Sequence, residues 1–124
     1  MDIYNLFISF LKEELSVSWR DVDESSLNFS YNNLNYMFVY NKNADNHYFR
    51  LLLPKIDQGN PNYPLLSELN YSVKTAKGFV VDNNYTWISC EQFVFSEISI
   101  NLLFRRMMSS LDYYLSLYRQ KANV

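Results

Sequence analysis

Apolar and polar positions along this chain change period several times, and each change marks the boundary of an expected element. Apolar side chains recur every three or four positions over residues 3–15, which predicts an amphipathic helix that ends near Ser16. Asp2 can cap this helix, because a carboxylate accepts a hydrogen bond from a free N–H of the first turn. The acidic run at 21–24 breaks the period, and it lacks the spaced oxygen ligands of a calcium loop. We interpret it as a solvated linker.

From Ser26 the period is two, which is typical of strands with one buried face. The alternation predicts strands over residues 26–31, 34–40 and 48–53. Asn32 and Asn33 lie between the first two strands, and asparagine tolerates the left-handed backbone that a tight hairpin turn requires. Residues 41–46 are polar and predict a loop, and Pro54 ends the third strand because it has no N–H to donate to a ladder.

The second half of the chain predicts a short helix, a hairpin and a long helix. The short helix runs from about residue 63 or 64 to 71 or 73, with Pro64 in its first turn. Strands over 77–81 and 85–92 flank a turn at 82–84, and Gly78 marks a bulge or a close approach of the backbone to a neighbour. An apolar helical pattern then follows Ser96-Glu97 and extends to the C-terminal region.

The element order is α-β-β-β-α-β-β-α, and no linker or repeat divides residues 1–124 into more than one domain. Five strands joined mainly by hairpins predict an antiparallel sheet in an α+β fold, with the three helices on one face. Apolar residues nevertheless alternate onto both faces of the strands. Either the sheet curls around the helices or another subunit covers the open face.

The last helix has a wider apolar surface than one small core requires, so we expect it to contact a second chain or a peptide as well as its own sheet. Methionine and tyrosine suit such surfaces, because their side chains are adaptable or amphipathic. The predicted partner-binding residues are Phe7, Phe10, Met107, Met108, Leu111, Tyr114 and Tyr118. A stripe of this kind also serves as ordinary core, and the sequence leaves that alternative open.

Composition narrows the class of partner. Hydrophobic residues make up 48% of the chain and aromatic residues 18%, which is typical of a folded protein. The formal net charge of -2 argues against nucleic acid and against an anionic membrane surface. The first residues lack a basic leader, and no apolar run approaches the ~20 residues that cross a bilayer, so we expect a cytoplasmic protein.

Catalytic and metal-binding chemistry has little support in the sequence. His47 is the one histidine, and no nucleophile motif accompanies it. Cys90 is the one cysteine; it alternates with Ile88 along a predicted strand, so a small buried side chain is the expected role. No phosphate-cradling glycine loop is present. We therefore expect no enzyme, no cofactor and no metal.

The order of elements, the Leu69-Asn70 pair near the end of the short helix, the hairpin over 77–92 and the amphipathic last helix resemble the type III secretion chaperone-like fold. Within that fold the chain is most similar to the bacterial YbjN-like family, which is labelled as sensory transduction regulators. The resemblance implies a compact α+β domain that pairs with itself and binds polypeptides without catalysis. It transfers no individual functional residue.

The predicted function is therefore a non-catalytic, chaperone-like or regulatory domain that acts as a homodimer and binds a polypeptide client or partner protein. The client would lie in an apolar groove beside the first or last helix, or would pair with an open strand edge. The alternative is a small ligand-binding or hydrolytic domain, with Trp87 and His47 lining a pocket between sheet and helices. A structural subunit of a larger assembly is a third possibility.

Overall fold

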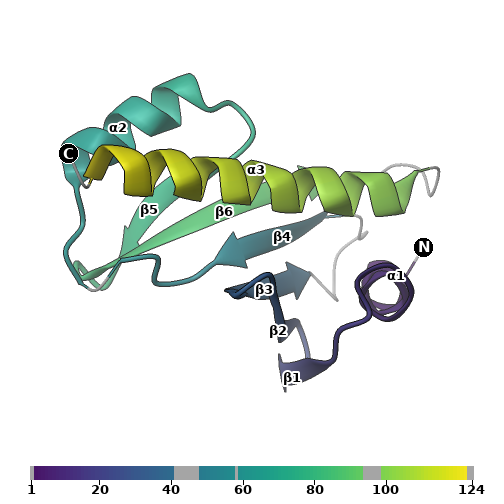
Figure 1. The fold of residues 1–124 in the computed structure, drawn as a ribbon. Coiled ribbons are helices and arrows are strands. Elements are labelled where there is room, and N and C mark those ends of the chain that lie inside the picture. Colours follow the sequence, from purple (N-terminus) through teal and green to yellow (C-terminus); the bar gives the residue numbers. More distant parts are fainter. Residues whose placement is uncertain (1, 41–47, 58, 94–98, 123–124) are drawn as a thin grey trace.

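A computed structural model describes residues 2–40, 48–57, 59–93 and 99–122, with the side chain of Phe93 excepted. Its sheet is antiparallel, with the strand order β1-β2-β3-β4-β6-β5. The elements in chain order are α1 (Ile3–Phe10), η1 (Leu11–Leu15), β1 (Trp19–Asp23), β2 (Ser26–Tyr31), β3 (Leu34–Tyr40), β4 (Tyr48–Leu53), α2 (Tyr63–Ser72), β5 (Lys77–Val81), β6 (Tyr85–Phe93) and α3 (Ile100–Ala122). Helices α2 and α3 lie side by side on one face of the sheet (Figure 1). The predicted α+β class is confirmed.

The first helix begins and ends where the sequence predicts. The Asp2 carboxylate accepts a hydrogen bond from the backbone N–H of Asn5, which caps α1. Beyond Phe10 the helix widens into the π-helical turn η1, a feature that its apolar pattern did not predict. Ser16 ends this turn in the left-handed conformation, and its N–H returns to the carbonyl of Leu11, as C-terminal helix caps do.

The sheet has six strands, so the predicted number of five is wrong. The additional strand is β1, and it includes residues that the acidic pattern assigned to a linker. Arg20 of β1 lies opposite Asn28 of β2, and Asp21 lies opposite Leu27. The register shifts between Asp21 and Asp23, which marks a bulge. An outermost strand exposes its side chains to solvent, and β1 therefore lacks the apolar alternation that identified its neighbours.

Both predicted hairpin turns are confirmed, and their backbone explains their sequence. Asn32 and Asn33 have φ values of 51° and 64°, and Asp82 and Asn83 have 56° and 61°. Asparagine and aspartate adopt this left-handed region more readily than other residues with side chains. The predicted start of the last helix at Ser96-Glu97 and the loop at 41–46 lie outside the described residues.

The core lies between the helices and one face of the sheet, and aromatic rings fill much of it. Phe7 of α1 stacks on Phe38 of β3 with ring centroids 4.1 Å apart, and Phe104 of α3 packs edge-on against Phe7 at 4.9 Å. Such aromatic pairs add to the stabilisation that area burial provides. None of the described helices combines the length and hydropathy that a membrane crossing requires.

The opposite face of the sheet has its own apolar side chains, because neighbours in a strand alternate between faces. Leu52 is only 2% exposed although it does not belong to the core cluster. Met37, Val39, Phe79 and Trp87 are half-buried on this same face. We call this surface the helix-free face.

Asn70 near the end of α2 joins three elements. Its side-chain amide donates to the carbonyl of Gly78 at 2.8 Å and accepts from the N–H of Gly78 at 2.7 Å, as a neighbouring strand would do. The hydroxyl of Tyr114 in α3 donates to the same Asn70 oxygen at 2.6 Å. A Cβ atom at position 78 would lie 2.6 Å from both Leu66 and Tyr114, so glycine permits this approach. The predicted close approach at Gly78 is confirmed.

Asp57 attaches the segment after β4 to the end of the sheet and to α3. Its carboxylate accepts hydrogen bonds from the backbone N–H of Thr86 at 3.2 Å, the Thr86 hydroxyl at 2.5 Å and the Tyr118 hydroxyl at 3.0 Å. Burial alone raises the pKa of Asp57. The bonds from Thr86 and Tyr118 outweigh burial and leave that pKa below its ordinary value.

We expect Asn70→Ala to lower the free energy of unfolding by about 3 kcal/mol, because it leaves the buried N–H and C=O of Gly78 and the Tyr114 hydroxyl without partners. Urea unfolding measures the loss. Asn101→Ala is the matched control, since the Asn101 side chain has only an exposed 3.4 Å contact with Glu14. The control should change stability by less than about 0.5 kcal/mol. Equal effects of the two substitutions would contradict the role assigned to Asn70.

Asp57 should make folding sensitive to acid. Because its pKa is lower in the folded chain than in the unfolded chain, its ionised form stabilises the fold above the unfolded pKa. That contribution is lost as the pH falls through the folded pKa, below the ordinary carboxyl value of about 3.9. We therefore expect Asp57→Asn to be less stable than the wild type at pH 7, and the gap to narrow toward pH 3.

Urea titrations of both proteins at each pH measure this gap. Glu14 and Asp23 also have lowered pKa values, but they are present in both proteins and cancel in the comparison. A gap that stays constant from pH 7 to pH 3 would show that the Asp57 charge does not stabilise the fold.

Candidate functional site

The residues predicted to bind a partner are buried within this chain. Each is 6% exposed or less, and all belong to the core cluster: Phe7, Phe10, Met107, Met108, Leu111, Tyr114 and Tyr118. Their apolar stripe packs against the sheet and the other helices, which is the core alternative that the sequence left open. The assignment of these side chains to a partner surface is therefore corrected to a core role. The site must be sought elsewhere.

Cys90 and His47 were the candidate nucleophiles, and the structure describes only Cys90. The Cys90 thiol lies in the core, and burial first, then the charge of Glu91, raises its pKa to about 11. Such a thiol stays protonated at neutral pH and is a poor nucleophile. His47 lies outside the described residues. Among the described residues, no three His, Cys, Asp or Glu side chains are grouped so that they could hold a metal ion.

Polar side chains converge near one surface hollow, but they form their hydrogen bonds with other groups of the same chain. This hollow of about 450 Å³ lies between the segment at 57–64 and the end of α3, and both Asp57 and Tyr118 line it. The two carboxylate oxygens of Asp57 already accept bonds from Thr86 and Tyr118. Trp87, expected in a pocket beneath the helices, lies on the helix-free face instead. The arrangement is that of a structural attachment.

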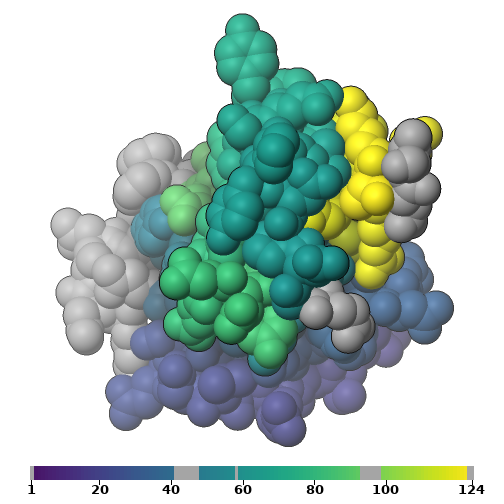
Figure 2. All heavy atoms as spheres, turned by 90° about the vertical axis from the view of Figure 1, so that its left-hand side faces the viewer, coloured from purple at the N-terminus to yellow at the C-terminus, as the bar shows by residue number. Residues whose placement is uncertain are grey.

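The two outer strands of the sheet differ in their access to a partner. The outer side of strand β5 is covered by α2 at Gly78, because Asn70 occupies the N–H and C=O of that residue and the Lys77 ammonium binds the carbonyls of Asn70 and Val73. Figure 2 faces this end of the molecule and shows α2 (teal) against the β5–β6 hairpin (green). No described strand pairs with the outer side of β1. The open edge is therefore β1.

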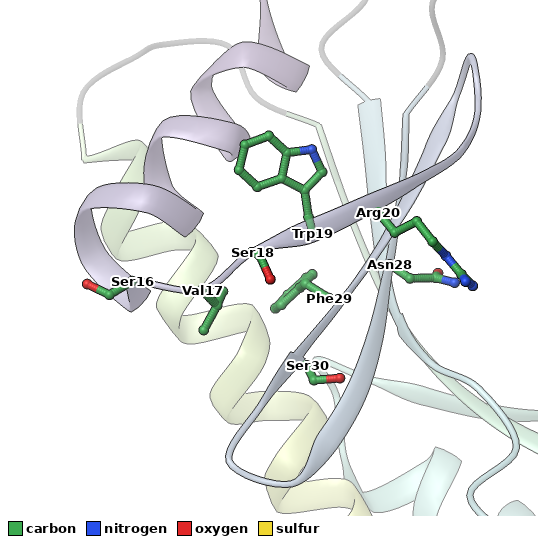
Figure 3. A pocket seen from close by; sticks show the side chains of 8 residues that line it. All are labelled: Ser16, Val17, Ser18, Trp19, Arg20, Asn28, Phe29 and Ser30. Atoms are coloured by element: carbon green, nitrogen blue, oxygen red, sulfur yellow. The ribbon is translucent and has the colours of Figure 1, made fainter.

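A surface hollow of about 500 Å³ lies at the start of β1 (Figure 3). Its lining combines apolar and polar side chains: Ser16, Val17, Ser18, Trp19, Arg20, Asn28, Phe29 and Ser30. Arg20 and Asn28 extend side by side, away from the indole of Trp19. The side-chain oxygen of Asn28 is buried and has no hydrogen-bond partner among the described residues. We call this hollow with the outer side of β1 the β1 edge site.

Carboxylates dominate the electrostatics near the other end of β1. The Tyr4 hydroxyl donates to Asp21 at 2.5 Å, and this bond first, then burial, raises the pKa of Tyr4 to about 12. Tyr40 lies beside Tyr4, with ring centroids 5.0 Å apart. Burial raises the pKa of Tyr40, and four nearby carboxylates raise it further: Asp2, Asp21, Asp23 and Glu24. Ionisation of a tyrosine is disfavoured where negative charge is concentrated.

Sequence reasoning missed this site because it assigned residues 21–24 to a solvated linker. Two apolar residues within or beside the acidic run were the available signal. Trp19 begins β1, and Val22 is 48% exposed in the middle of the strand. Aromatic and β-branched residues favour strands, but the surrounding charges hide that preference at an edge.

Comparison with known proteins identifies the fold. No family model and no curated protein matches this sequence. Among solved structures, the chain is similar to the one described as "Crystal structure of YbjN, a putative transcription regulator from E. coli", with a TM-score of 0.67 and 14% sequence identity. The alignment covers 96% of this chain and 93% of that chain. At such low identity the likeness is one of fold alone, and it confirms the family resemblance at that level: the chain has a YbjN-like α+β fold.

Proposed function

We propose that this chain is a non-catalytic, polypeptide-binding domain of chaperone-like or regulatory type that acts as a homodimer. The observation that carries the proposal is the β1 edge site, where a strand whose outer side pairs with no described strand adjoins a hollow of about 500 Å³. An extended peptide can join such a strand through main-chain hydrogen bonds, while its side chains enter neighbouring hollows. Backbone pairing of this kind requires no catalytic group.

Strand pairing replaces the helix groove as the binding mode. The groove would need exposed apolar side chains on α1 and α3, and those predicted are in the core. The solved neighbour is described as a regulator, which is compatible with a regulatory role for this chain.

The helix-free face supports the homodimer. Met37, Val39, Phe79 and Trp87 leave apolar surface outside the core, and the indole N–H of Trp87 is buried without a partner among the described residues. Exposed apolar surface of this kind marks sites of association. A second copy of the chain would cover it.

We expect the chain to elute as a dimer at tens of micromolar in size-exclusion chromatography with light scattering. Val39→Glu should shift it toward the monomer, because a charge on the helix-free face disfavours apolar contact between copies. Leu102→Glu is the matched control, since Leu102 is exposed on α3, on the other side of the sheet. A wild-type protein that is monomeric under these conditions would overturn the homodimer.

We also expect the chain to bind an unfolded model polypeptide, such as reduced and carbamidomethylated lysozyme, in a fluorescence anisotropy titration. Ser18→Trp should weaken binding by about tenfold, because the indole fills the hollow that the client enters. Ser116→Trp is the control, since Ser116 is exposed on α3. Absence of binding by the wild type, or equal binding by both variants, would contradict polypeptide recognition at β1.

A further inference from the structure

The features of the β1 edge site suit one kind of polypeptide segment. Resting on the proposed function, we propose that it selects an extended segment that carries basic residues together with an apolar side chain. The apolar side chain enters the hollow at the start of β1, and the basic residues lie opposite the carboxylates at its other end. The selection follows from three features of the site: its negative charge, the shape of its hollow, and the outer side of β1, with which no described strand pairs.

The negative charge at β1 is not paired with a cation in the part of the chain that the structure describes. Among the described residues, none of the four carboxylates near β1 forms an ion pair. Their hydrogen bonds come from neutral groups. Asp21 accepts from the Tyr4 hydroxyl, Asp23 accepts from the N–H of Ser25 and the Ser26 hydroxyl, and Asp2 accepts from Asn5. Neutral donors orient a carboxylate and leave its charge in place, so the site retains an unmatched negative potential.

The nearest cations on the same elements face elsewhere. The Lys12 ammonium lies over the ring of Trp19, 5.3 Å from its centroid. Arg20 extends beside Asn28, at the hollow (Figure 3). The acidic end of the strand is therefore open to a cation from a partner. The bulge places Asp21 and Asp23 on opposite faces of β1, so lysine or arginine at neighbouring positions of a paired segment would meet one carboxylate on each face.

The hollow supplies the apolar part of the selection. Val17, Trp19 and Phe29 give it apolar walls, and Ser16, Ser18 and Ser30 add polar groups at its surface. Burial of one large apolar side chain gives only weak binding by itself. Main-chain pairing and charge must supply the rest. Phosphate-bearing partners are disfavoured, because the same carboxylates repel them.

The test uses two fluorescein-labelled twelve-residue peptides that alternate lysine with valine, or glutamate with valine, each with one central phenylalanine. We expect the lysine peptide to bind at least tenfold more tightly at low salt. The preference should shrink at 1 M salt, where the Debye length is about 3 Å. The double variant Asp21→Asn/Glu24→Gln should lose most of the preference while it keeps the neutral hydrogen bonds of the wild type.

The matched control removes two charges from a distant surface. Asp82→Asn/Asp112→Asn changes exposed residues of the second hairpin turn and of α3, and it should retain the wild-type preference. Thermal unfolding of each variant verifies its fold before titration. Ser18→Trp should weaken binding of the lysine peptide by about tenfold.

The outcomes separate this inference from the proposed function. Equal binding of the two peptides, or tighter binding of the glutamate peptide, overturns the selection for basic segments while the unfolded lysozyme still binds. A lysine preference that survives in the β1 charge variant also overturns it, because the binding surface then lies elsewhere. If neither peptide nor the unfolded protein binds the wild type, the proposed function itself is wrong.

Discussion

The side-chain amide of Asn70 is the interaction on which the arrangement of this molecule depends. It pairs with both backbone groups of Gly78 and also accepts the hydroxyl of Tyr114, so one residue joins α2, β5 and α3. Burial raises the pKa of Tyr114 to about 12, which keeps that hydroxyl protonated and able to donate. The junction requires glycine at position 78, because the tyrosine ring and Leu66 occupy the space of a side chain. The junction thus gives the buried polar groups their hydrogen-bond partners and also lets α2, β5 and α3 pack closely.

The same junction decides which edge of the sheet can meet another chain. Natural sheets protect their outer strands, since unpaired N–H and C=O groups invite pairing with other molecules. Here α2 covers β5, and the Asn70 amide stands where a further strand would pair. At the other end, β1 has only a bulge and its acidic side chains as protection. A bulge and charges deter an identical or acidic strand, but they do not deter a basic one. The two outer strands of the sheet therefore differ in how they are protected.

Two groups of carboxylates illustrate how context sets the role of one residue type. Asp57 has both oxygens occupied by Thr86 and Tyr118, so its charge is used within the fold. Asp21 and Asp23 accept bonds from neutral neighbours and remain at the surface. The first arrangement attaches a loop to the sheet. The second leaves charge available for recognition.

The sequence by itself determined most of the local structure. Period-two alternation located β2 to β4, the asparagine and aspartate turns located both hairpins, and the Asp2 cap located the start of α1. These features depend on residues a few positions apart, so local patterns contain them. The sequence also singled out Gly78 and Asn70, but it did not show that these two residues bond to each other.

Only the tertiary structure decided the rest, because it depends on contacts between residues distant in sequence. Strand β1 is fixed by its pairing with β2, and its charged residues hid the preference of Trp19 and Val22 for a strand. The wide apolar stripe of α3 belongs to the core because α1, α2 and the sheet surround it, and an apolar pattern specifies burial without specifying what covers it. Which edge is closed likewise follows from an eight-residue separation between Asn70 and Gly78 and a 44-residue separation between Asn70 and Tyr114. Periodicity shows which side chains avoid water, whereas three-dimensional packing alone decides which neighbours they find.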